Sequence, residues 1–463
     1  HQWFVNILDK KEELLAQNDK MQWKPEFMKK RSNDWINNLH WDWNISRNRK
    51  FGIPIPVWRS LKTGEVILPS EQQLANGPVD PSVDMPENLP ADHTTDDIKG
   101  ETLVLDTWFT SGLSPLINQN LVERDGYTKS ILPMSLRPQA HDIIRTWLLY
   151  TTLHAYLRDE SIPFENIMIS GFVLAGKNEK ISKSKNNAKA SPEQILGQWG
   201  ADAVRYWASG GQLGKDMIFD EAELKNGQKL VTKLWNASNF VQMLTEGFDP
   251  KADFDTATLL ATDRWIISRA NQVIKKMQDY LNNYEYGLAK LAFEEFFWAD
   301  FCDNYLELVK LRLYKPELFE NGEEKKLAGQ WTLHQVLLVI LKLIAPYLPH
   351  ISEEIYQNIF RATEETISIH KTLFPTDILT IDNAEAIVLI EQMEKVLEIV
   401  EQVRKFKTEQ QISLGAELTN LVVSGPAEYL AEIKHYEDDL VGVTKTQNIE
   451  YLEKDGIACL CEV

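Results

Sequence analysis

Two lysines with hydroxyl-bearing residues beside them form the pattern in this sequence that is best suited to chemistry. The pattern contains Lys180, Ser182, Lys183 and Ser184, and it follows an apolar run at 167–174 that predicts a β-strand. On a loop after a strand, two ammonium groups and two hydroxyls can surround a polyphosphate, because they supply mobile charge and several hydrogen-bond donors. A solvated basic loop is the alternative for so short a string.

The elements around this pattern alternate between apolar runs and helical patterns. Residues 143–156 and 191–208 are predicted as helices on either side of the strand at 167–174, and residues 102–105 give a further strand signal. This alternation predicts a parallel α/β sheet. Residues 61–100 are rich in Pro, Asp and Asn, which predicts a loop-like insertion with little regular structure.

From about residue 220 to 370 the pattern becomes purely helical. In one segment the N-cap candidates Thr262 and Asp263 precede a single apolar face. That face consists of Ile266, Ala270, Val273, Met277 and Leu281. Further helices, which complete a predicted helical bundle, are expected at 286–313, 328–346 and 350–361. A Glu- and Lys-rich helix then leads to strand signals at 418–424 and 449–463, and these predict a small α/β tail.

Length and composition indicate several ordinary globular domains. The 463 residues suggest about three domains, and 43% hydrophobic with 25% charged residues excludes collagen-like, low-complexity and wholly disordered chains. The net charge of −19 means that a polyanion must find local basic patches. Three cysteines cannot build a disulfide framework or a four-thiolate zinc site, which favours a reducing compartment, the cytoplasm.

Neither membrane insertion nor secretion is predicted. The most apolar run, residues 336–344, is interrupted by Lys342 and is well short of the ~20 residues that a membrane span needs, so we expect a buried helix and no membrane partner. No signal peptide opens the chain. The chain begins with His1 rather than Met, which indicates processing or truncation.

Three segments resemble, in order, the second half of the catalytic domain of class I aminoacyl-tRNA synthetases. They are the lysine pattern at 180–184, Gly200-Ala201-Asp202-Ala203-Val204-Arg205, and Lys233-Leu234-Trp235-Asn236-Ala237-Ser238. Upstream, residues 45–58 are similar to the segment by which such enzymes return to the nucleotide fold after a large editing insertion. Segments of the helical region, such as 296–302 and 346–355, resemble the anticodon-binding domain of the same family.

The resemblance implies a fold class of α/β followed by all-α. A Rossmann-like half-domain is expected at 1–210, including the insertion at 61–100, and a stem-contact or linker region at 211–250. A helical anticodon-binding domain is expected at 251–375 and the C-terminal helix with its α/β tail at 376–463.

Two stretches favour valine as the amino acid. Residues 105–113, with Thr107 followed by Trp108, are similar to the valyl pattern within the family, and Asp142 is followed by two apolar residues where isoleucyl enzymes carry Gln-His. The flanking residues 136–140 look more like the archaeal-type valyl enzymes. An isoleucyl enzyme is the alternative.

The resemblance also implies roles for particular residues. Catalysis is expected of Lys180, Ser182, Lys183 and Ser184; ATP and adenylate binding of Lys183, His141 and Asp142; and the valine pocket of Trp108 and Ile143. ATP and Mg²⁺ are the implied cofactors, and tRNA(Val), valine and ATP the implied partners of a monomer. Exposed basic residues are expected to contact tRNA, namely Lys229, Lys233, Lys310, Arg312, Lys315, Arg404, Lys405 and Lys407.

Two departures from the family pattern limit this interpretation. Residues 58–64 contain no cysteines where many relatives carry a zinc-binding pair, so a hairpin without metal is expected, and Cys459 and Cys461 are predicted to be buried thiols. The nine histidines include no pair three residues apart, which the family's His-x-Gly-His motif requires, and no editing insertion precedes residue 1. We therefore expect a C-terminal portion of such an enzyme; a tRNA-binding module without catalysis is the alternative.

Overall fold

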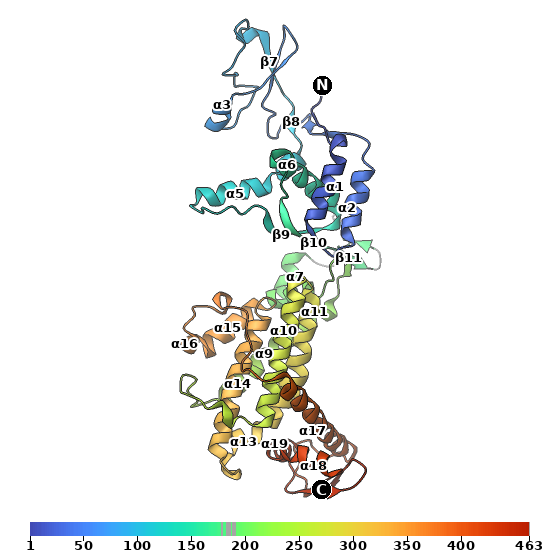
Figure 1. Ribbon diagram of the computed structural model, residues 1–463, viewed down its shortest axis with the longest axis vertical. Helices are drawn as coiled ribbons and strands as arrows, with labels where there is room; N and C mark the ends of the chain where they lie inside the picture. Colours follow the sequence, from blue (N-terminus) through green and yellow to red (C-terminus); the bar gives the residue numbers. More distant parts are fainter. Residues whose placement is uncertain (177–178, 182–186, 188–190, 463) are drawn as a thin grey trace. The chain divides into compact units, whose positions relative to one another are not determined.

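The computed structural model describes residues 1–176, 179–181, 187 and 191–462 (Figure 1). The chain divides into two compact units. Unit 1 consists of His1–Val173 and Gln212–Met217, and unit 2 of Leu174–Gly211 and Ile218–Val463. The chain therefore leaves unit 1 after Val173 and returns to it only for a short segment.

Unit 1 contains a three-stranded parallel sheet. Its order is β2 (Gln22–Lys24), β10 (Phe164–Ser170) and β9 (Met134–Ala140). Ser170 pairs with Ala140, so β9 and β10 end at the same edge of the sheet. Ile167 and Ile169 are fully buried in a cluster that includes residues of the helix after β9. The predicted parallel sheet is confirmed, but the strand predicted at 167–174 starts earlier, at Phe164, and ends at Ser170, and a separate strand begins at Val173.

The helix predicted at 143–156 is present, but it starts irregularly. A 3-10 turn, His141–Ile143, leads into a single π-helical turn, Ile144–Leu148, and only then into α6 (Leu149–Asp159). Outside the insertion at 61–100, the other α-helices of unit 1 are α1 (Lys11–Lys20), α2 (Met28–Asn37), α4 (Thr107–Ser111) and α5 (Ser114–Arg124). Short antiparallel pairs join β1 (Phe4–Val5) to β3 (Trp43–Asn44) and β4 (Ser46–Arg47) to β8 (Val104–Leu105).

The insertion forms a small subdomain of unit 1. The hairpin of β5 (Trp58–Ser60) and β6 (Val66–Ile67) pairs with β7 (Ile98–Gly100), and one short helix, α3 (Glu71–Asn76), lies between them in sequence. Trp58 is almost fully buried in a four-residue apolar cluster. The predicted hairpin and the predicted scarcity of regular structure are confirmed.

Unit 2 begins with the strands β11 (Val173–Gly176), which starts at the boundary, and β12 (Glu179–Lys180). The single helix predicted at 191–208 is wrong: Gly200, with φ of 80°, separates α7 (Pro192–Trp199) from α8 (Ala201–Ala208). A left-handed backbone conformation favours glycine and ends a helix. The sequence assigned these residues to the α/β domain, but in the structure they belong to unit 2, because α8 packs on α9 (Glu221–Leu244) and α15 (Pro349–Ile359). The predicted limits at 250 and 375 stay predictions.

Helices of very different lengths form the bundle that the sequence predicts. They are α10 (Ala261–Asn282), α11 (Tyr286–Glu295), a π-helical segment at Phe296–Tyr305, α12 (Leu306–Leu308), α13 (Lys310–Tyr314), α14 (Gly322–Ile344), α15, α16 (Arg361–Glu364) and α17 (Asn383–Glu409). The predicted N-cap of α10 needs correction. Leu260 is the N-cap, and Asp263 lies inside the first turn, where its carboxylate accepts the Leu260 N–H.

Helix α14 is the one helix in the described part of the chain that is long and apolar enough to cross a membrane. Its most apolar window is 78% buried among the other helices, and the core helix of a bundle passes the same test of length and composition. The predicted burial of residues 336–344 is confirmed.

The tail is a small α/β layer. A mixed sheet has the order β15 (Ile449–Glu453), β14 (Asn420–Gly425), β16 (Ala458–Glu462), with β15 parallel and β16 antiparallel to β14. Helices α18 (Ala427–Lys434) and α19 (Glu437–Thr444) connect β14 to β15. Cys459 and Cys461, predicted as buried thiols, are half-buried free thiols on β16.

Candidate active site

The predicted adenylate-binding residues lie at the carboxyl edge of the parallel sheet. His141 and Asp142 follow β9 directly, and they occupy the 3-10 turn where ligands of open α/β sheets usually bind. Asp142 is exposed, so its carboxylate is accessible to a ligand. The His141 ring packs against Phe172, which follows the neighbouring strand, with ring centroids 4.2 Å apart.

Asp216 is a member of this cluster that the sequence analysis missed. Its Oδ1 accepts a hydrogen bond of 2.7 Å from the Phe172 N–H and lies 3.5 Å from Nε2 of His141. A Cβ on Gly171 would lie 2.0 Å from the Lys215 carbonyl oxygen, so only glycine allows the two backbones to approach this closely. No spacing pattern in the sequence connects residue 141 with residue 216, because their proximity arises from the return of the chain to unit 1.

The predicted valine-pocket residues, Trp108 and Ile143, lie on or next to two short elements that pack against each other. Trp108 lies on α4 and is 36% exposed, and α4 packs against the π turn that follows Ile143 and against α6. The indole Nε1 of Trp147 donates a hydrogen bond of 2.8 Å to the Ser111 carbonyl at the end of α4. Trp108 and Ile143 therefore belong to two segments that are bonded to each other.

The start of α4 is bonded to residues 45–58, the segment that resembles the return of the chain to the nucleotide fold after an editing insertion. Asp106 is the N-cap of α4, its N–H donates to the Ile45 carbonyl at 2.7 Å, and its Oδ1 lies 3.1 Å from Nη2 of Arg47. Ser46 and Leu105 pair in the antiparallel register of β4 and β8. Two motifs that were recognised separately in the sequence are thus neighbours in the fold.

The lysine pattern begins in a hairpin. Strand β12 pairs antiparallel with β11, with Lys180 opposite Leu174 in the register. The predicted catalytic residues Ser182, Lys183 and Ser184 lie outside the described residues. Their roles, and that of the Lys180 side chain, stay predictions.

Three of the predicted tRNA contacts are half-buried cations with acidic or carbonyl neighbours. Lys233 on α9 lies 3.9 Å from Oδ1 of Asp303, whose carbonyl accepts a hydrogen bond of 3.2 Å from Arg404 on α17. Lys310 pairs with Glu307 at 2.5 Å. Lys233 and Arg404 therefore approach the same acidic residue, Asp303, from different helices.

Arg312 and Lys407 are wrongly predicted as exposed contacts. The Arg312 side chain is fully buried: its Nη1 and Nη2 donate to the Asp263 carboxylate at 3.0 and 2.5 Å, and its Nε lies 3.1 Å from Oδ1 of Asp439. Burial lowers the pKa of Arg312, but the two carboxylates outweigh it and raise the pKa above the usual value. Lys407 donates to three backbone carbonyls and is 1% exposed. Both cations stabilise the fold and cannot reach a polyanion.

The Gly200–Arg205 motif makes contacts within unit 2. Asp202 accepts the backbone N–H groups of His350 and Ile351, at 3.2 and 2.8 Å, at the N-terminus of α15. Arg205 donates to the Pro346 and Tyr347 carbonyls just before α15. The motif therefore attaches α8 to the helical bundle.

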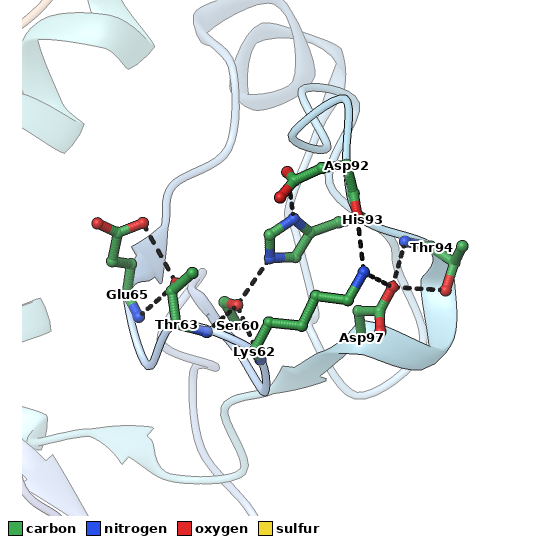
Figure 2. Close-up of polar contacts among 8 residues, drawn as sticks. All are labelled: Ser60, Lys62, Thr63, Glu65, Asp92, His93, Thr94 and Asp97. Carbon is green, nitrogen blue, oxygen red and sulfur yellow. Dashed lines mark hydrogen bonds and ion pairs between the residues drawn. The ribbon is translucent and has the colours of Figure 1, made fainter.

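The cysteine-free hairpin is held by polar side chains, here called the polar knuckle: Ser60, Lys62, Asp92, His93, Thr94 and Asp97 (Figure 2). The Ser60 hydroxyl accepts the backbone N–H groups of Lys62 and Thr63, so its own hydrogen is directed at Nε2 of His93, 2.7 Å away. Nδ1 of His93 lies 2.8 Å from the Asp92 carboxylate. Both ring nitrogens of this histidine are satisfied.

An ammonium group occupies the middle of the polar knuckle. Nζ of Lys62 donates to the Asp92 carbonyl at 2.6 Å and lies 2.8 Å from Oδ2 of Asp97, which also accepts from the Thr94 N–H and hydroxyl (Figure 2). Lys62 and Thr94 hold the pKa of Asp97 well below its usual range. Across the described residues no group of three or more His, Cys, Asp or Glu side chains is arranged to hold a metal ion.

The family models match the chain in two consecutive regions. Residues 1–220 match tRNA synthetases class I (I, L, M and V), and residues 263–422 match the anticodon-binding domain of tRNA ligase. The chain belongs to the class I tRNA synthetases, as the sequence analysis predicts.

Within this family, the similar relatives include several valine–tRNA ligases. The enzyme of Ehrlichia canis is 40% identical over 97% of this chain and 52% of its own length, and that of Rickettsia canadensis is 39% identical over 98% and 55%. The chain thus spans about half the length of the curated relatives it matches. The archaeal-type likeness of residues 136–140 stays a prediction.

Solved structures confirm the fold class. The LeuRS of Agrobacterium radiobacter K84, in a ternary complex with tRNA and LeuAMS, has a TM-score of 0.57 at 16% identity and covers 83% of this chain and 44% of its own. The methionyl-tRNA synthetase of Mycobacterium tuberculosis, bound by methionyl-adenylate, has a TM-score of 0.54 at 17% identity and covers 82% and 68%.

Proposed function

We propose that this chain supplies the lysine-loop half of the active site and the tRNA-binding domain of a valine–tRNA ligase. The reaction would join valine to ATP as valyl-adenylate, release pyrophosphate, and transfer the valyl group to tRNA(Val). The observation that carries the proposal is the hydrogen bond between Trp147 and the Ser111 carbonyl. It joins the two sequence stretches whose residues favour valine, 105–113 and 141–147. The identity of about 40% to valine–tRNA ligases along nearly the whole chain supports the same amino acid.

The residues at the sheet edge suit an adenylate. The exposed Asp142 carboxylate can accept hydrogen bonds from ribose hydroxyls, while His141, held by Phe172 and Asp216, lies beside it. Lys180 and Lys183 would stabilise the negative charge that develops as pyrophosphate leaves. Mg²⁺, bound through the nucleotide phosphates, would supply further charge neutralisation.

The amino-acid pocket would be apolar and small. Trp108 is partly accessible on α4 and would form one wall, with Ile143 as the other. An apolar pocket separates amino acids that differ by one methylene by only ~1–3 kcal/mol. Valine is therefore expected to be preferred over isoleucine by a modest factor that depends on the exact placement of Trp108.

The helical bundle would bind tRNA, mainly through its phosphates. Lys233 and Arg404 converge on Asp303, and the exposed Lys229, Lys315 and Lys405 add positive charge in the same unit. Phosphate contacts make affinity fall steeply with salt. A monomer in the cytoplasm is the proposed state, and the three free cysteines suit a reducing compartment of this kind.

A lysine variant tests the proposal. In an enzyme form that activates valine, in which a first half-fold with the His-x-Gly-His-type motif accompanies this chain, Lys183→Ala should lower the rate of pyrophosphate exchange far more than it weakens valine binding. An unchanged exchange rate would remove Lys183 from the mechanism. Pyrophosphate exchange that depends on isoleucine rather than valine would show that isoleucine is the substrate. Salt-sensitive tRNA binding without pyrophosphate exchange in any enzyme form would favour a tRNA-binding module.

A further inference from the structure

The short segment by which the chain returns to unit 1, residues 212–217, contains a carboxylate to which the proposed mechanism gives no step of its own. We infer that Asp216 is a positioning residue for ATP binding, because it contacts the loops that follow two neighbouring strands and so orients the turn that presents Asp142. The inference rests on the proposed function, in which Asp142 binds the adenylate ribose. It adds a residue that does not itself touch the substrate.

The return segment, residues 212–217, lies along the end of β10. The Gly214 N–H donates to the Ile169 carbonyl at 2.8 Å. The Met217 N–H donates to the Phe172 carbonyl at 2.9 Å. Between these two positions in the sequence, Oδ1 of Asp216 accepts the Phe172 N–H at 2.7 Å. The Asp216 side chain therefore has a defined place at the carboxyl edge of the sheet, although it is 40% exposed.

Close packing on its other side restricts the return segment further. Gly214 has φ of 74°, and a Cβ on it would lie 2.6 Å from Cζ of Phe27, the N-cap residue of α2. A left-handed conformation and so close an approach both favour glycine. The return segment is thus packed between the end of β10 and the start of α2, which leaves its backbone little freedom to move.

Asp216 also faces the turn that follows β9. Its Oδ1 lies 3.5 Å from Nε2 of His141, whose ring packs against Phe172. This 3-10 turn has three residues, and its N-cap residue, Ala140, makes no side-chain capping bond. Hydrogen bonds in 3-10 turns have poorer geometry than those of an α-helix, so the turn depends on contacts from other elements. The contacts of His141 with Asp216 and Phe172 therefore orient it.

The Asp216 carboxylate connects the residues that follow two strand ends. Because β9 and β10 end at the same edge of the sheet, a group that contacts both His141 and Phe172 sets the distance between their loops. Asp142 follows His141 in the same turn, so its carboxylate moves with that ring. Ligands of open α/β sheets bind at this edge. Loss of the Asp216 contacts would therefore weaken ATP binding without removing a group that touches ATP.

Two substitutions of Asp216 test this inference in the valine-activating enzyme form. Alanine removes the acceptor, whereas asparagine keeps Oδ1 and removes the charge. We expect Asp216→Ala to raise the KM for ATP in pyrophosphate exchange about fivefold, which corresponds to about 1 kcal/mol, the contribution of one hydrogen bond. The kcat and the KM for valine should stay within about twofold, because ground-state and transition-state binding of ATP change alike. Asp216→Asn should restore the KM for ATP to within about twofold of the unsubstituted enzyme.

The same two variants have a readout that does not depend on activity. In the 463-residue chain, hydrogen exchange of the Phe172 amide should accelerate in Asp216→Ala, because alanine removes the acceptor of that N–H. Exchange should stay unchanged in Asp216→Asn, which keeps the acceptor. An unchanged exchange rate in Asp216→Ala would show that Asp216 does not hold the end of β10, and it would overturn the inference.

Asp84→Ala is the matched control. The Asp84 carboxylate also accepts a backbone N–H at 2.7 Å, that of Asp80, but it lies in the insertion. Its KM for ATP should stay unchanged. The inference would be overturned by equal rises in Asp216→Ala and Asp84→Ala, by an unchanged KM for ATP in Asp216→Ala, or by a rise in Asp216→Asn as large as that in Asp216→Ala.

Asp142→Ala separates this inference from the proposed function. A raised KM for ATP in Asp142→Ala together with an unchanged KM in Asp216→Ala would leave the adenylate site in place and overturn the positioning role alone. An unchanged KM for ATP in Asp142→Ala would mean that Asp142 does not bind ATP. The proposed function would then lose its adenylate argument, and the inference, which acts through Asp142, would fall with it.

Discussion

Two charged networks join distant parts of the chain, one at the surface of unit 1 and the other in the core of unit 2. In the polar knuckle, Lys62 and Asp97 pair with side chains that are 45% and 22% exposed. In the bundle, Arg312 pairs with Asp263 and Asp439 in a site with almost no exposure, which we call the buried lock. Both networks use the same chemistry, but water competes for the first and not for the second.

The difference in exposure gives the two networks different effects on stability. An exposed ion pair contributes little to global stability, so the polar knuckle can order a local loop without controlling the whole unit. Removing one partner of a buried ion pair leaves an uncompensated charge in the core. Because the buried lock joins α19 to α10 and α13, we expect these three helices to lose their packing together. The tail and the anticodon-binding bundle are therefore expected to unfold together.

The largest expected effect is that of Arg312→Met. Because the variant leaves two buried carboxylates without their counter-ion, we expect unit 2 to lose about 3–5 kcal/mol of stability. Urea unfolding of the whole chain, followed by circular dichroism, measures this loss. Lys315→Met removes a nearby exposed cation and should change stability by less than about 0.5 kcal/mol. A loss below about 1 kcal/mol in Arg312→Met would contradict the role of the buried lock.

The next largest expected effect on stability comes from a buried histidine, His334, and it depends on pH. Both ring nitrogens of His334 lack a hydrogen-bond partner among the described residues, and burial lowers its pKa to about 4. The unfolded chain takes up a proton near pH 6.5 and the folded chain does not, so stability is present above this pH and is lost as pH falls towards 4.

This loss should amount to about 2 kcal/mol between pH 7.5 and pH 5. In His334→Leu, which removes the titrating group, the fall in unfolding free energy over that range should be smaller by the same amount. An identical pH dependence in the variant and the unsubstituted chain would show that His334 does not carry the effect.

The smallest expected effect on stability is that of Lys62→Met. Because this ammonium is partly exposed, the unfolding temperature should change by less than about 2 °C. Amide exchange of residues 92–97 should nevertheless accelerate, since the Lys62 contacts hold this loop. Lys99→Met, at an exposed position of β7, should leave exchange unchanged. Equal exchange in both variants would mean that Lys62 does not organise the polar knuckle.

The regular parts of the fold follow from apolar patterns, and the irregular parts do not. The run at 167–174 predicted a strand of a parallel sheet because burial on both faces leaves a nearly continuous apolar segment. The π turn at 144–148 escaped prediction because one extra residue in a turn hardly changes the apolar spacing. The break at Gly200 was missed although glycine at the end of a helical pattern is a stop signal.

The candidate site was predictable where side chains follow strand ends. His141 and Asp142 directly follow β9, the place at the strand ends that the family resemblance implies, although no strand was predicted at 134–140; their roles stay predictions. Arg312 was misassigned because its buried partner Asp439 lies far along the chain, and nothing local marks an arginine as buried. The Trp147–Ser111 bond has a backbone acceptor, which carries no signature in sequence.

Formation of valyl-adenylate tests the central claim most directly. This chain carries the lysine pattern but contains no pair of histidines three residues apart, and activation needs phosphate-binding elements on both sides of ATP. Valine-dependent pyrophosphate exchange is therefore expected to be absent with the 463-residue chain alone and restored when a first half-fold with the His-x-Gly-His-type motif is supplied. Exchange by the chain alone, or exchange after complementation that does not prefer valine, would contradict the account.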